Sequence, residues 1–353
     1  MSKTCKVCVD NEVLTANVGD LLLDAALMNG VDIPFDCRAG HCGTCRVRVV
    51  EGQFFGGAND DPDTVMACQC RITSDAKVVL EDVPEIVTRS GYIAKLTNLA
   101  QDVIEVAVEP SRPTPYLPGQ YFQLRLRDFP ARCYSAAAPL SRRHDDRLVR
   151  FQVRVLPRGR VSSRLGRKIH AGHRIKLTGP MGFAYLRPRL KNRLVLVASG
   201  TGFAPIWSIA DAAMRENSTR ELVLIVGARK VESLYMIEAL CRLARCPNVT
   251  IIPVVSERQS VSAAIRYGHP VDYLPALSPD DIVYAAGAPR IVGAVASLAR
   301  AAGARCFSDP FEAAINVSDE RSIAGRMMHW LGGRTVDLAS TTHRAVLQTQ
   351  VHA

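Results

Sequence analysis

Cysteines cluster at the amino end of this chain. Seven of the eleven stand before residue 71, and Cys37, Cys42 and Cys45 share nine residues in the order C-x4-C-x2-C. Cys68 follows after a further 22 residues, and two glycines inside the run would let the backbone approach a bound group closely. Without a secretory signal, such a cluster indicates metal ligands or buried thiols rather than disulfides. Thiolates at this spacing therefore predict a metal centre.

The metal that this spacing fits best is iron. Plant-type 2Fe–2S ferredoxins hold their cluster with C-x4-C-x2-C and a more distant fourth cysteine. Structural zinc sites usually pair two short C-x2-4-C knuckles, and the second half of this pattern lacks that form. The order Cys68-Gln69-Cys70 leaves the fourth ligand open between two cysteines. Cys5 and Cys8 lie in an alternating stretch that is typical of strand packing.

A glycine-rich turn in the second half of the chain has the form of a nucleotide-binding turn. A predicted strand over Leu194–Ala198 runs into Gly200-Thr201-Gly202 and then Pro205. Glycines between a strand and a helix let the backbone approach a pyrophosphate, and the helix N-terminus supplies a favourable field. The G-x-G-x-x-G pattern is absent. The next strand ends without an acidic residue for a ribose hydroxyl, and Arg229 follows it, so the residues alone favour NADPH.

The first 86 residues are expected to form one domain that positions the cysteines. An alternating stretch predicts a hairpin, and a helix is expected to begin with Asp20 as its N-cap. The buried face of that helix is expected to comprise Leu22, Leu23, Ala26 and Leu27. Gly, Asn, Asp and Pro predict a loop over 56–63, and a linker is expected over 83–90.

Two further domains and a tail are expected after residue 86. Residues 87–190 hold short β-branched runs between Pro and Gly turns, as in a small antiparallel barrel. The strands expected there include Val103–Val108, Tyr121–Leu126, Leu148–Val155 and Arg174–Leu177. Residues 191–311 alternate strands with helices, which predicts a parallel α/β sheet. Its strands are expected at Leu194–Ala198, Leu222–Val226, Val249–Val255 and Ile282–Ala286. Residues 312–353 form a tail of unknown role with an amphipathic stretch over Arg321–Leu331.

Charge divides the chain in the same way. Residues 1–86 hold 7 Lys and Arg against 14 Asp and Glu, a balance of −7, and the remainder holds 37 against 20, a balance of +17. The basic residues are spread out and no nucleic-acid motif accompanies them, so phosphate-rich cofactors explain the split better than nucleic acid. The most apolar stretch, 194–214, is broken by Gly and Pro, which excludes a membrane span there. A cytoplasmic protein is expected.

The amino-terminal motifs resemble a known family. The segment Cys37–Cys45 (CRAGHCGTC) and the segment Val65–Gln69 (VMACQ) are similar to the ferredoxin domain of reductases that serve bacterial aromatic-ring-hydroxylating (Rieske-type) dioxygenases. The resemblance implies a β-grasp ferredoxin domain with a 2Fe–2S cluster. It selects Cys68, in the A-C-Q position, over Cys70 as the fourth ligand. The implied metal ligands are Cys37, Cys42, Cys45 and Cys68.

Three central motifs resemble the flavin site of the ferredoxin–NADP reductase superfamily. These are Pro118-Gly119-Gln120-Tyr121, R-x-Y-S at Arg132, Tyr134 and Ser135, and Gly159-Arg160-Val161-Ser162. The resemblance implies that Arg132 binds a flavin phosphate, that the Tyr134 ring lies against the isoalloxazine and that the Ser135 hydroxyl bonds flavin N5. Gly159, Val161 and Ser162 would open a helix at the pyrophosphate, which favours FAD over FMN. In isolation the same residues are typical of a turn arginine and a core tyrosine.

The motifs of the predicted nicotinamide site resemble the same superfamily. Gly200, Thr201, Gly202 and Pro205 match G-T-G-x-A-P, which implies that Thr201 lies near the nicotinamide. Gly287 and Pro289 match C-G-x-P, with Ala286 in place of the cysteine. The order of Arg229, Leu234 and Tyr235 also occurs in NADH-linked dioxygenase reductases, so NADH is favoured over NADPH. Phe311 resembles the family's end, where it would shield the flavin or pack under the tail.

Together these motifs predict an electron-transfer flavoprotein. The resemblance implies the route NADH to FAD to 2Fe–2S to the ferredoxin or oxygenase of an aromatic-ring-hydroxylating dioxygenase system, in aromatic-hydrocarbon catabolism. Tyr134, Ser135 and Thr201 are the residues expected beside the reacting rings. The same route feeding a di-iron monooxygenase or another acceptor is the main alternative, and a redox sensor is a third. Neither nucleic acid nor a membrane is expected as a partner.

Overall fold

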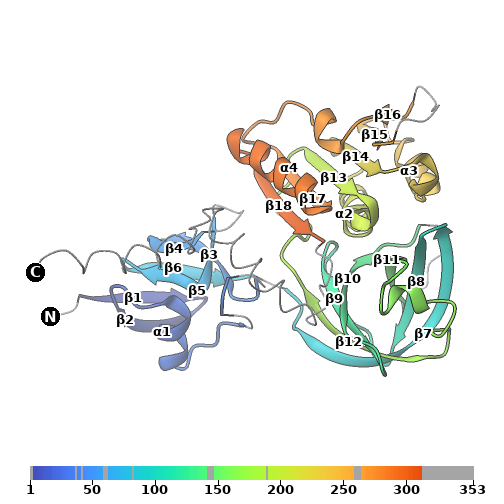
Figure 1. The fold of residues 1–353 in the computed structure, drawn as a ribbon. Helices are drawn as coiled ribbons and strands as arrows, with labels where there is room; N and C mark the ends of the chain where they lie inside the picture. The colour runs from blue at the N-terminus through green and yellow to red at the C-terminus, as the bar shows by residue number, and fades with distance from the viewer. Residues whose placement is uncertain are drawn as a thin grey trace, which may run out of the picture. The chain divides into compact units, whose positions relative to one another are not determined.

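The computed structural model describes residues 3–35, 38–40, 43–58, 63–81, 83–140, 147–187, 190–257 and 264–311. Within these ranges the chain folds into three successive sheets, the second of which is a closed barrel (Figure 1). The predicted fold class is confirmed: a ferredoxin-type domain, an antiparallel barrel and a parallel α/β sheet follow one another along the chain. The amphipathic stretch predicted over 321–331 lies outside the described residues.

The first sheet has the β-grasp arrangement, in which a mixed sheet packs against one helix. Its six strands lie in the order β2-β1-β6-β3-β5-β4, with β1 parallel to β6 and the other pairs antiparallel. The elements are β1 (Thr4–Val9), β2 (Glu12–Asn17), α1 (Leu22–Met28), β3 (Arg46–Glu51), β4 (Phe54–Ala58), β5 (Thr64–Ile72) and β6 (Ala76–Leu80). Leu22, Leu23 and Ala26 of α1 are buried in its core, and β5 lies beside them.

Three local predictions for this domain are wrong. Asp20 is not the N-cap of α1, because its carboxylate accepts the backbone N–H of Asn17 at 2.8 Å and Leu21 occupies the cap position. Leu27 is 40% exposed, because the chain turns back after α1 and Val31 is buried in the core instead. The loop expected from residue 56 begins later, since β4 continues to Ala58.

The second sheet closes into an antiparallel barrel in the order β10-β11-β8-β7-β12-β9. Its elements are β7 (Val87–Ala100), β8 (Val103–Pro110), β9 (Tyr121–Leu126), β10 (Arg132–Ala137), β11 (Val149–Arg154), the 3-10 turn η1 (Ser162–Arg164) and β12 (Arg174–Met181). The linker predicted over 83–90 is shorter than expected, because β7 begins at Val87. Inward-facing side chains fill the barrel, with Phe122 and Phe151 in edge-to-face contact in its core.

The third sheet is parallel and doubly wound, with the strand order β16-β15-β14-β13-β17-β18. Its elements are β13 (Leu194–Ser199), η2 (Gly200–Gly202), α2 (Phe203–Glu216), β14 (Leu222–Ala228), η3 (Val231–Ser233), α3 (Ile237–Leu243), β15 (Val249–Val255), β16 (Arg266–Tyr267), η4 (Pro270–Tyr273), β17 (Ile282–Gly287), α4 (Pro289–Ala301) and β18 (Arg305–Pro310). One face of the sheet packs against α2 and α3, and the opposite face packs against α4. The central strands are apolar throughout because both faces are covered.

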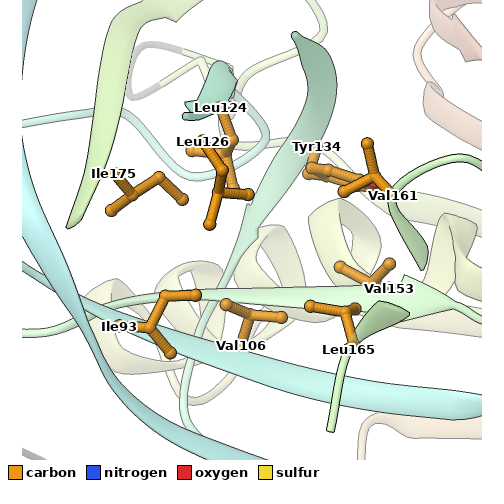
Figure 2. A pocket seen from close by; sticks show the side chains of 9 residues that line it. All are labelled: Ile93, Val106, Leu124, Leu126, Tyr134, Val153, Val161, Leu165 and Ile175. Atoms are coloured by element: carbon orange, nitrogen blue, oxygen red, sulfur yellow. The ribbon is translucent and has the colours of Figure 1, made fainter. Parts of the chain in front are cut away.

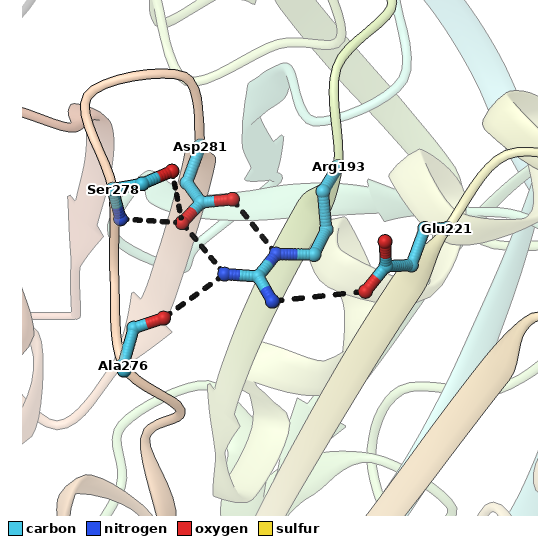
Figure 3. A network of polar contacts seen from close by, with 5 residues as sticks. All are labelled: Arg193, Glu221, Ala276, Ser278 and Asp281. Atoms are coloured by element: carbon cyan, nitrogen blue, oxygen red, sulfur yellow. Dashed lines mark hydrogen bonds and ion pairs between the residues drawn. The ribbon is translucent and has the colours of Figure 1, made fainter.

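A polar network joins the amino ends of three neighbouring strands of this sheet (Figure 3). Arg193, just before β13, makes two bonds of 2.7 Å to the buried carboxylate of Asp281, which precedes β17. The guanidinium also lies 3.6 Å from Glu221, which precedes β14, and donates to the carbonyl of Ala276. Ser278 donates its N–H and its hydroxyl to Asp281. This network fixes the end of the sheet that lies away from the glycine turns.

Among the described residues, no helix has the length and apolar character that crossing a membrane requires.

Candidate cofactor-binding sites

The glycine turn at Gly200–Gly202 lies at the topological switch point of the parallel sheet. Strand β13 pairs with β14 on one side and with β17 on the other. The chain therefore builds the sheet outward in one direction from β13 and later in the opposite direction, so the strand order reverses beside β13. Ligands of doubly wound sheets bind in the crevice at the carboxyl ends of the strands at such a point. The turn stands at the carboxyl end of β13, and α2 begins directly after it. Pro205 fits the first turn of α2, where backbone N–H groups have no intrahelical partner.

Two glycines hold the ends of β13 and β17 in close contact. A Cβ on Gly202 would lie 2.1 Å from the carbonyl oxygen of Ala286, and a Cβ on Gly287 would lie 2.2 Å from the carbonyl oxygen of Ser199. The Ser199 hydroxyl accepts the N–H of Ala288 at 2.7 Å, one residue before α4 begins at Pro289. These contacts bring the two nucleotide motifs of the sequence together, with Thr201 beside them and half-buried.

Ala286 is buried at the position where the resemblance predicts a cysteine. It pairs with Ala198 across the two central strands, so the site lacks the thiol but keeps the backbone approach. The nicotinamide motif therefore departs from the family pattern in one side chain.

The two basic residues after β14, Arg229 and Lys230, make different contacts with Glu257. Arg229 is exposed, and its carbonyl accepts the N–H of Glu257. Lys230 lies 3.6 Å from the Glu257 carboxylate. Glu257, which follows β15, therefore places a negative charge beside the predicted ribose site. Sequence reasoning missed it because Glu257 follows β15, whereas Arg229 and Lys230 follow β14.

The R-x-Y-S residues occupy β10 of the barrel. Ser135 is buried and pairs with Tyr121 of β9, and Tyr134 pairs with Phe122. The Ser135 hydroxyl lies 3.1 Å from the carboxylate of Asp309 in β18, to which it donates. Burial raises the pKa of Asp309 to about 6. Burial likewise raises the pKa of Tyr134 to about 12, so its phenol stays neutral. This pair places a hydroxyl and a carboxyl side by side where β10 and β18 meet.

The run at Gly159–Ser162 leads into the short 3-10 helix Ser162–Arg164, at the point where the sequence predicts that a helix opens. A Cβ on Gly159 would lie 2.3 Å from the Ser162 hydroxyl, which accepts the N–H of Leu156 at 3.1 Å. Ser163 donates to the Gly159 carbonyl at 2.6 Å. The turn closes on itself through these bonds, and only glycine fits at its start.

An apolar cavity inside the barrel is lined by Ile93, Val106, Leu124, Leu126, Tyr134, Val153, Val161, Leu165 and Ile175 (Figure 2). Almost all of these side chains are aliphatic, so the cavity supplies no set of donors for a phosphate or a flavin ring. It is part of the barrel core. Tyr134 and Val161 line it together, so the R-x-Y-S strand and the 159–162 turn meet there.

Two further predicted flavin residues, Arg132 and Phe311, lie in different domains. The Nη1 of Arg132, in β10, donates to the neighbouring Ala131 carbonyl at 2.8 Å. Phe311, directly after β18, is half-buried, and its N–H donates to the carbonyl of Gly287 at 2.7 Å. Phe311 is thereby tied to the C-G-x-P position.

The described cluster cysteines lie in the core of the first domain. Cys45 and Cys68 are both buried, and the N–H of Ala67 donates to the Cys45 carbonyl at 2.9 Å. Cys70 is buried on the same face of β5 as Cys68. A Cβ added to Gly57 would lie 2.6 Å from the Cβ of Cys70. Cys37 and Cys42 lie outside the described residues. Gly40 and Gly43 have positive φ values of 76° and 72°, as a loop that wraps a metal centre requires.

Several contacts that the sequence did not indicate bring the barrel and the parallel sheet together. Ser208 of α2 donates to the Ala136 carbonyl at 2.9 Å and accepts the Ala138 N–H at 2.8 Å. Tyr235 donates to Gln152 of β11 at 2.7 Å. Such pairs carry no local signal, because they depend on side chains from two domains. They place β10, with Ser135, next to the helix that follows the glycine turn.

Comparison with known proteins agrees with this arrangement. Family models match residues 4–73 (2Fe-2S iron-sulfur cluster binding domain), 91–185 (oxidoreductase FAD-binding domain) and 196–297 (oxidoreductase NAD-binding domain). The ferredoxin–NAD(P)+ reductase component of the naphthalene 1,2-dioxygenase system of Pseudomonas putida is 32% identical over 314 residues, 83% of this chain and 93% of that protein. The reductase component of phenol 2-monooxygenase from Pseudomonas sp. (strain CF600) is 30% identical over 276 residues, 73% of this chain and 77% of that protein.

A solved structure also matches most of this chain. The crystal structure of a cytochrome P450 reductase from Amycolatopsis matches with a TM-score of 0.61 and 27% identity, covering 87% of this chain and 99% of that one. The predicted electron route and cofactor classes are supported by all three domains. The chain belongs to the family of flavoprotein reductase components of aromatic oxygenase systems, oxidoreductases that join a 2Fe–2S domain to FAD-binding and NAD-binding domains.

Proposed function

We propose that this protein is a cytoplasmic, NADH-dependent reductase that delivers electrons to a Rieske-type ferredoxin or terminal oxygenase of an aromatic-ring-hydroxylating dioxygenase system. The observation that carries the proposal is the meeting of Ser135 of the barrel with Asp309 of the parallel sheet, next to the ends of β13 and β17. A hydride donor on the glycine turns and an acceptor on β10 would face each other there.

The chain's own residues would bind and orient the cofactors. Gly200 would leave room for a pyrophosphate, Gly202 and Gly287 let the ends of β13 and β17 approach each other, and Thr201 would stand at the nicotinamide. Arg132 and the turn at Gly159, Val161 and Ser162 would hold the flavin phosphates, Tyr134 would lie against the ring, and Ser135 would exchange its bond to Asp309 for one to the ring. When bound, NADH supplies hydride, FAD accepts it and releases electrons singly, and the cluster carries one electron at a time. Cys37, Cys42, Cys45 and Cys68 would hold that cluster.

NADH is preferred over NADPH because Glu257 offsets the charge of Lys230 beside the ribose site. A 2′-phosphate would meet this carboxylate, whereas a 2′-hydroxyl can donate to it. Steady-state reduction of ferricyanide with each nucleotide tests the preference. NADH is expected to give the higher kcat/KM, and Glu257→Gln should narrow the difference. A higher kcat/KM for NADPH in the wild-type protein would overturn this part of the proposal.

The second candidate is the same electron route feeding a di-iron monooxygenase, favoured by the likeness to the phenol 2-monooxygenase reductase component. The two candidates differ only in the acceptor. Purified reductase with NADH is mixed with a Rieske-type ferredoxin or with a di-iron hydroxylase, and the reduction of each is followed spectroscopically. Faster reduction of the ferredoxin supports the first proposal, and faster reduction of the hydroxylase supports the second.

A further inference from the structure

The six residues 182–187, here called the strap, leave strand β12 of the barrel and lead toward the parallel sheet. The strap contacts residues of all three domains. Its last residue, Arg187, is charged and yet only 6% exposed. A buried guanidinium is costly unless its surroundings are fixed and paired. The surroundings of Arg187 therefore show what the strap holds in place.

Arg187 joins the three domains at one point. Its guanidinium donates to the carbonyl of Phe183 at 2.9 Å, within the strap, and lies 3.5 Å from the centre of the Tyr185 ring. It lies 4.7 Å from the ring centre of Phe307, in β18 of the parallel sheet. Its Nε lies 3.9 Å from the carboxylate of Glu81, which directly follows β6 of the ferredoxin-type domain, and both side chains of this ion pair are almost fully buried.

The strap backbone is anchored to the parallel sheet as well. The hydroxyl of Tyr284, a fully buried residue of β17, donates to the Tyr185 carbonyl at 3.0 Å and accepts the Arg187 N–H at 3.1 Å. The Tyr185 hydroxyl donates to Glu81. Burial raises the pKa of that tyrosine, so its phenol remains a donor at neutral pH. Glu81 is thus held by two strap residues at once.

The other end of the strap lies between the flavin strands and the cluster loop. A Cβ on Gly182 would lie 2.8 Å from the ring of Tyr121, the residue paired with Ser135. A Cβ on Gly43 would lie 2.8 Å from the ring of Phe183. The buried guanidinium of Arg46 lies 4.9 Å from the centre of the same ring, and Arg46 directly follows Cys45 in the chain. The strap therefore contacts both the strands of the predicted flavin site and the loop of the predicted cluster.

We propose that the strap is a positioning element that sets the separation of the flavin and the cluster, with Arg187 as its anchor and Phe183 as its contact with the cluster loop. The proposal rests on the proposed function, since it assumes that electrons pass from flavin to cluster within this chain. Electron transfer slows steeply as two carriers move apart, so a loosened strap slows this step while hydride transfer continues. No bond forms or breaks at the strap, and no strap residue is oxidised or reduced.

The test compares Phe183→Ala with the conservative Phe183→Leu in the full holoprotein. Stopped-flow mixing with NADH follows flavin reduction by its absorbance, and rapid freeze-quench EPR follows the reduced cluster. Flavin reduction and ferricyanide turnover are expected to stay within about twofold of wild type. Cluster reduction is expected to fall by about tenfold or more in the alanine variant and to recover largely in the leucine variant. The EPR signal after complete reduction with dithionite measures the cluster content of each variant, and the freeze-quench signals are divided by it.

Variants at the anchor keep the proposal testable if Phe183→Ala does not fold. Glu81→Gln removes the buried charge pair, and Arg187→Lys removes the planar fork that bonds and stacks at once. Both are expected to slow cluster reduction selectively. Arg305→Ala is the matched control, because it breaks a more exposed 2.9 Å ion pair with Asp63, also between the first domain and the parallel sheet. It should leave both rates near wild type.

Two outcomes separate the inference from the function beneath it. Unchanged cluster reduction in Glu81→Gln, Arg187→Lys and the Phe183 variants, with intact flavin reduction, overturns the role of the strap and leaves the electron route standing. Failure of the wild-type cluster to accept electrons from NADH overturns the route itself.

Discussion

The hydroxyl of Ser135 lies 3.1 Å from the carboxylate of Asp309, and this bond connects strand β10 of the barrel with strand β18 of the parallel sheet. The two residues are 174 positions apart in the sequence. Each belongs to a different one of the two domains that match cofactor-binding families, so the bond marks where these domains meet. Asp309 is also the residue that precedes Pro310 and Phe311 at the end of the described chain.

Ser135→Ala should slow the reduction of bound FAD by NADH by about tenfold, the equivalent of about one hydrogen bond at the reacting ring. FAD content should be unchanged, because the phosphate-binding turn is intact. Stopped-flow absorbance in the presence of saturating NADH measures the effect. Ser163→Ala, which removes a bond within the 159–163 turn, is the comparison and should lower FAD affinity rather than the rate. An unchanged flavin reduction rate in Ser135→Ala would contradict the assignment.

Asp309→Asn should remove a pH dependence of stability. The folded-state pKa of Asp309 is about 6, above the usual value for an aspartate near 4, so this residue costs the wild type stability as pH rises from about 4 to about 6. Between pH 5 and pH 7.5 the free energy of unfolding of the wild type should therefore fall by about 1 kcal/mol relative to the asparagine variant. Urea unfolding followed by flavin fluorescence measures the difference. A wild type that gains stability over this pH range relative to the variant would show the opposite sign.

Cys68→Ala and Cys70→Ala form a matched pair on one face of β5. The first should lose the 2Fe–2S visible and EPR signals, and with them the reduction of cytochrome c, while ferricyanide reduction persists. The second should keep the cluster and lose about 1 kcal/mol of stability, because it deletes one buried sulfur next to Gly57. Iron content and EPR after dithionite reduction distinguish the two. Loss of the cluster in Cys70→Ala alone would reassign the fourth ligand.

Gly202→Ala should disable the nucleotide turn. The added methyl would lie 2.1 Å from the Ala286 carbonyl oxygen, so β13 or β17 must shift. An increase in the KM for NADH of about tenfold or more is expected, with FAD still bound. Gly293→Ala in α4 is the control, since nothing lies within 4 Å of its added methyl. It should stabilise the protein by about 1 kcal/mol and leave the KM unchanged. Equal KM values in the two variants would argue against the site.

Arg193→Ala should lower the free energy of unfolding by about 3 kcal/mol, because it leaves the buried Asp281 carboxylate without its main partner. Bonds from Arg193 hold the pKa of Asp281 below its usual range, so the stability they supply is complete at neutral pH and is lost only as pH falls below about 4. Arg215→Ala, at a more exposed pair with Asp211, should change stability by no more than about 0.5 kcal/mol. Urea titrations at neutral pH compare the two variants.

Local patterns were sufficient to predict most of the fold. The apolar runs at Leu222–Ala228 and Val249–Val255 are bounded by turn residues, so their strands could be predicted nearly to the residue. Short β-branched runs predicted β8 and β9 in the same way. The errors fall where tertiary contacts override local preference. The Asp20 carboxylate accepts the backbone N–H of Asn17 and does not cap the helix. The glycines near residue 56 lie in β4, which pairs with β5 through a bulge.

The site was predictable only in its separate parts. Residues of one motif, such as Gly200–Gly202, can be identified by their spacing. Asp309, Glu257 and Arg187 act through partners on other strands or in other domains, and no spacing rule in a single sequence links them. The motif spacing predicts Ser135 as a site residue. It does not predict its partner Asp309, because their bond exists only once the barrel and the parallel sheet have packed.

Arg193 and Asp281 lie at one end of the parallel sheet, and Gly202 and Gly287 lie at the other, separated by the full length of β13 and β17. Changes at sites this far apart usually combine additively. Thermal robustness and coenzyme choice can therefore be selected independently in this protein. A library at positions 229, 230 and 257 can be screened for altered nucleotide use while the opposite end of the sheet keeps the fold intact.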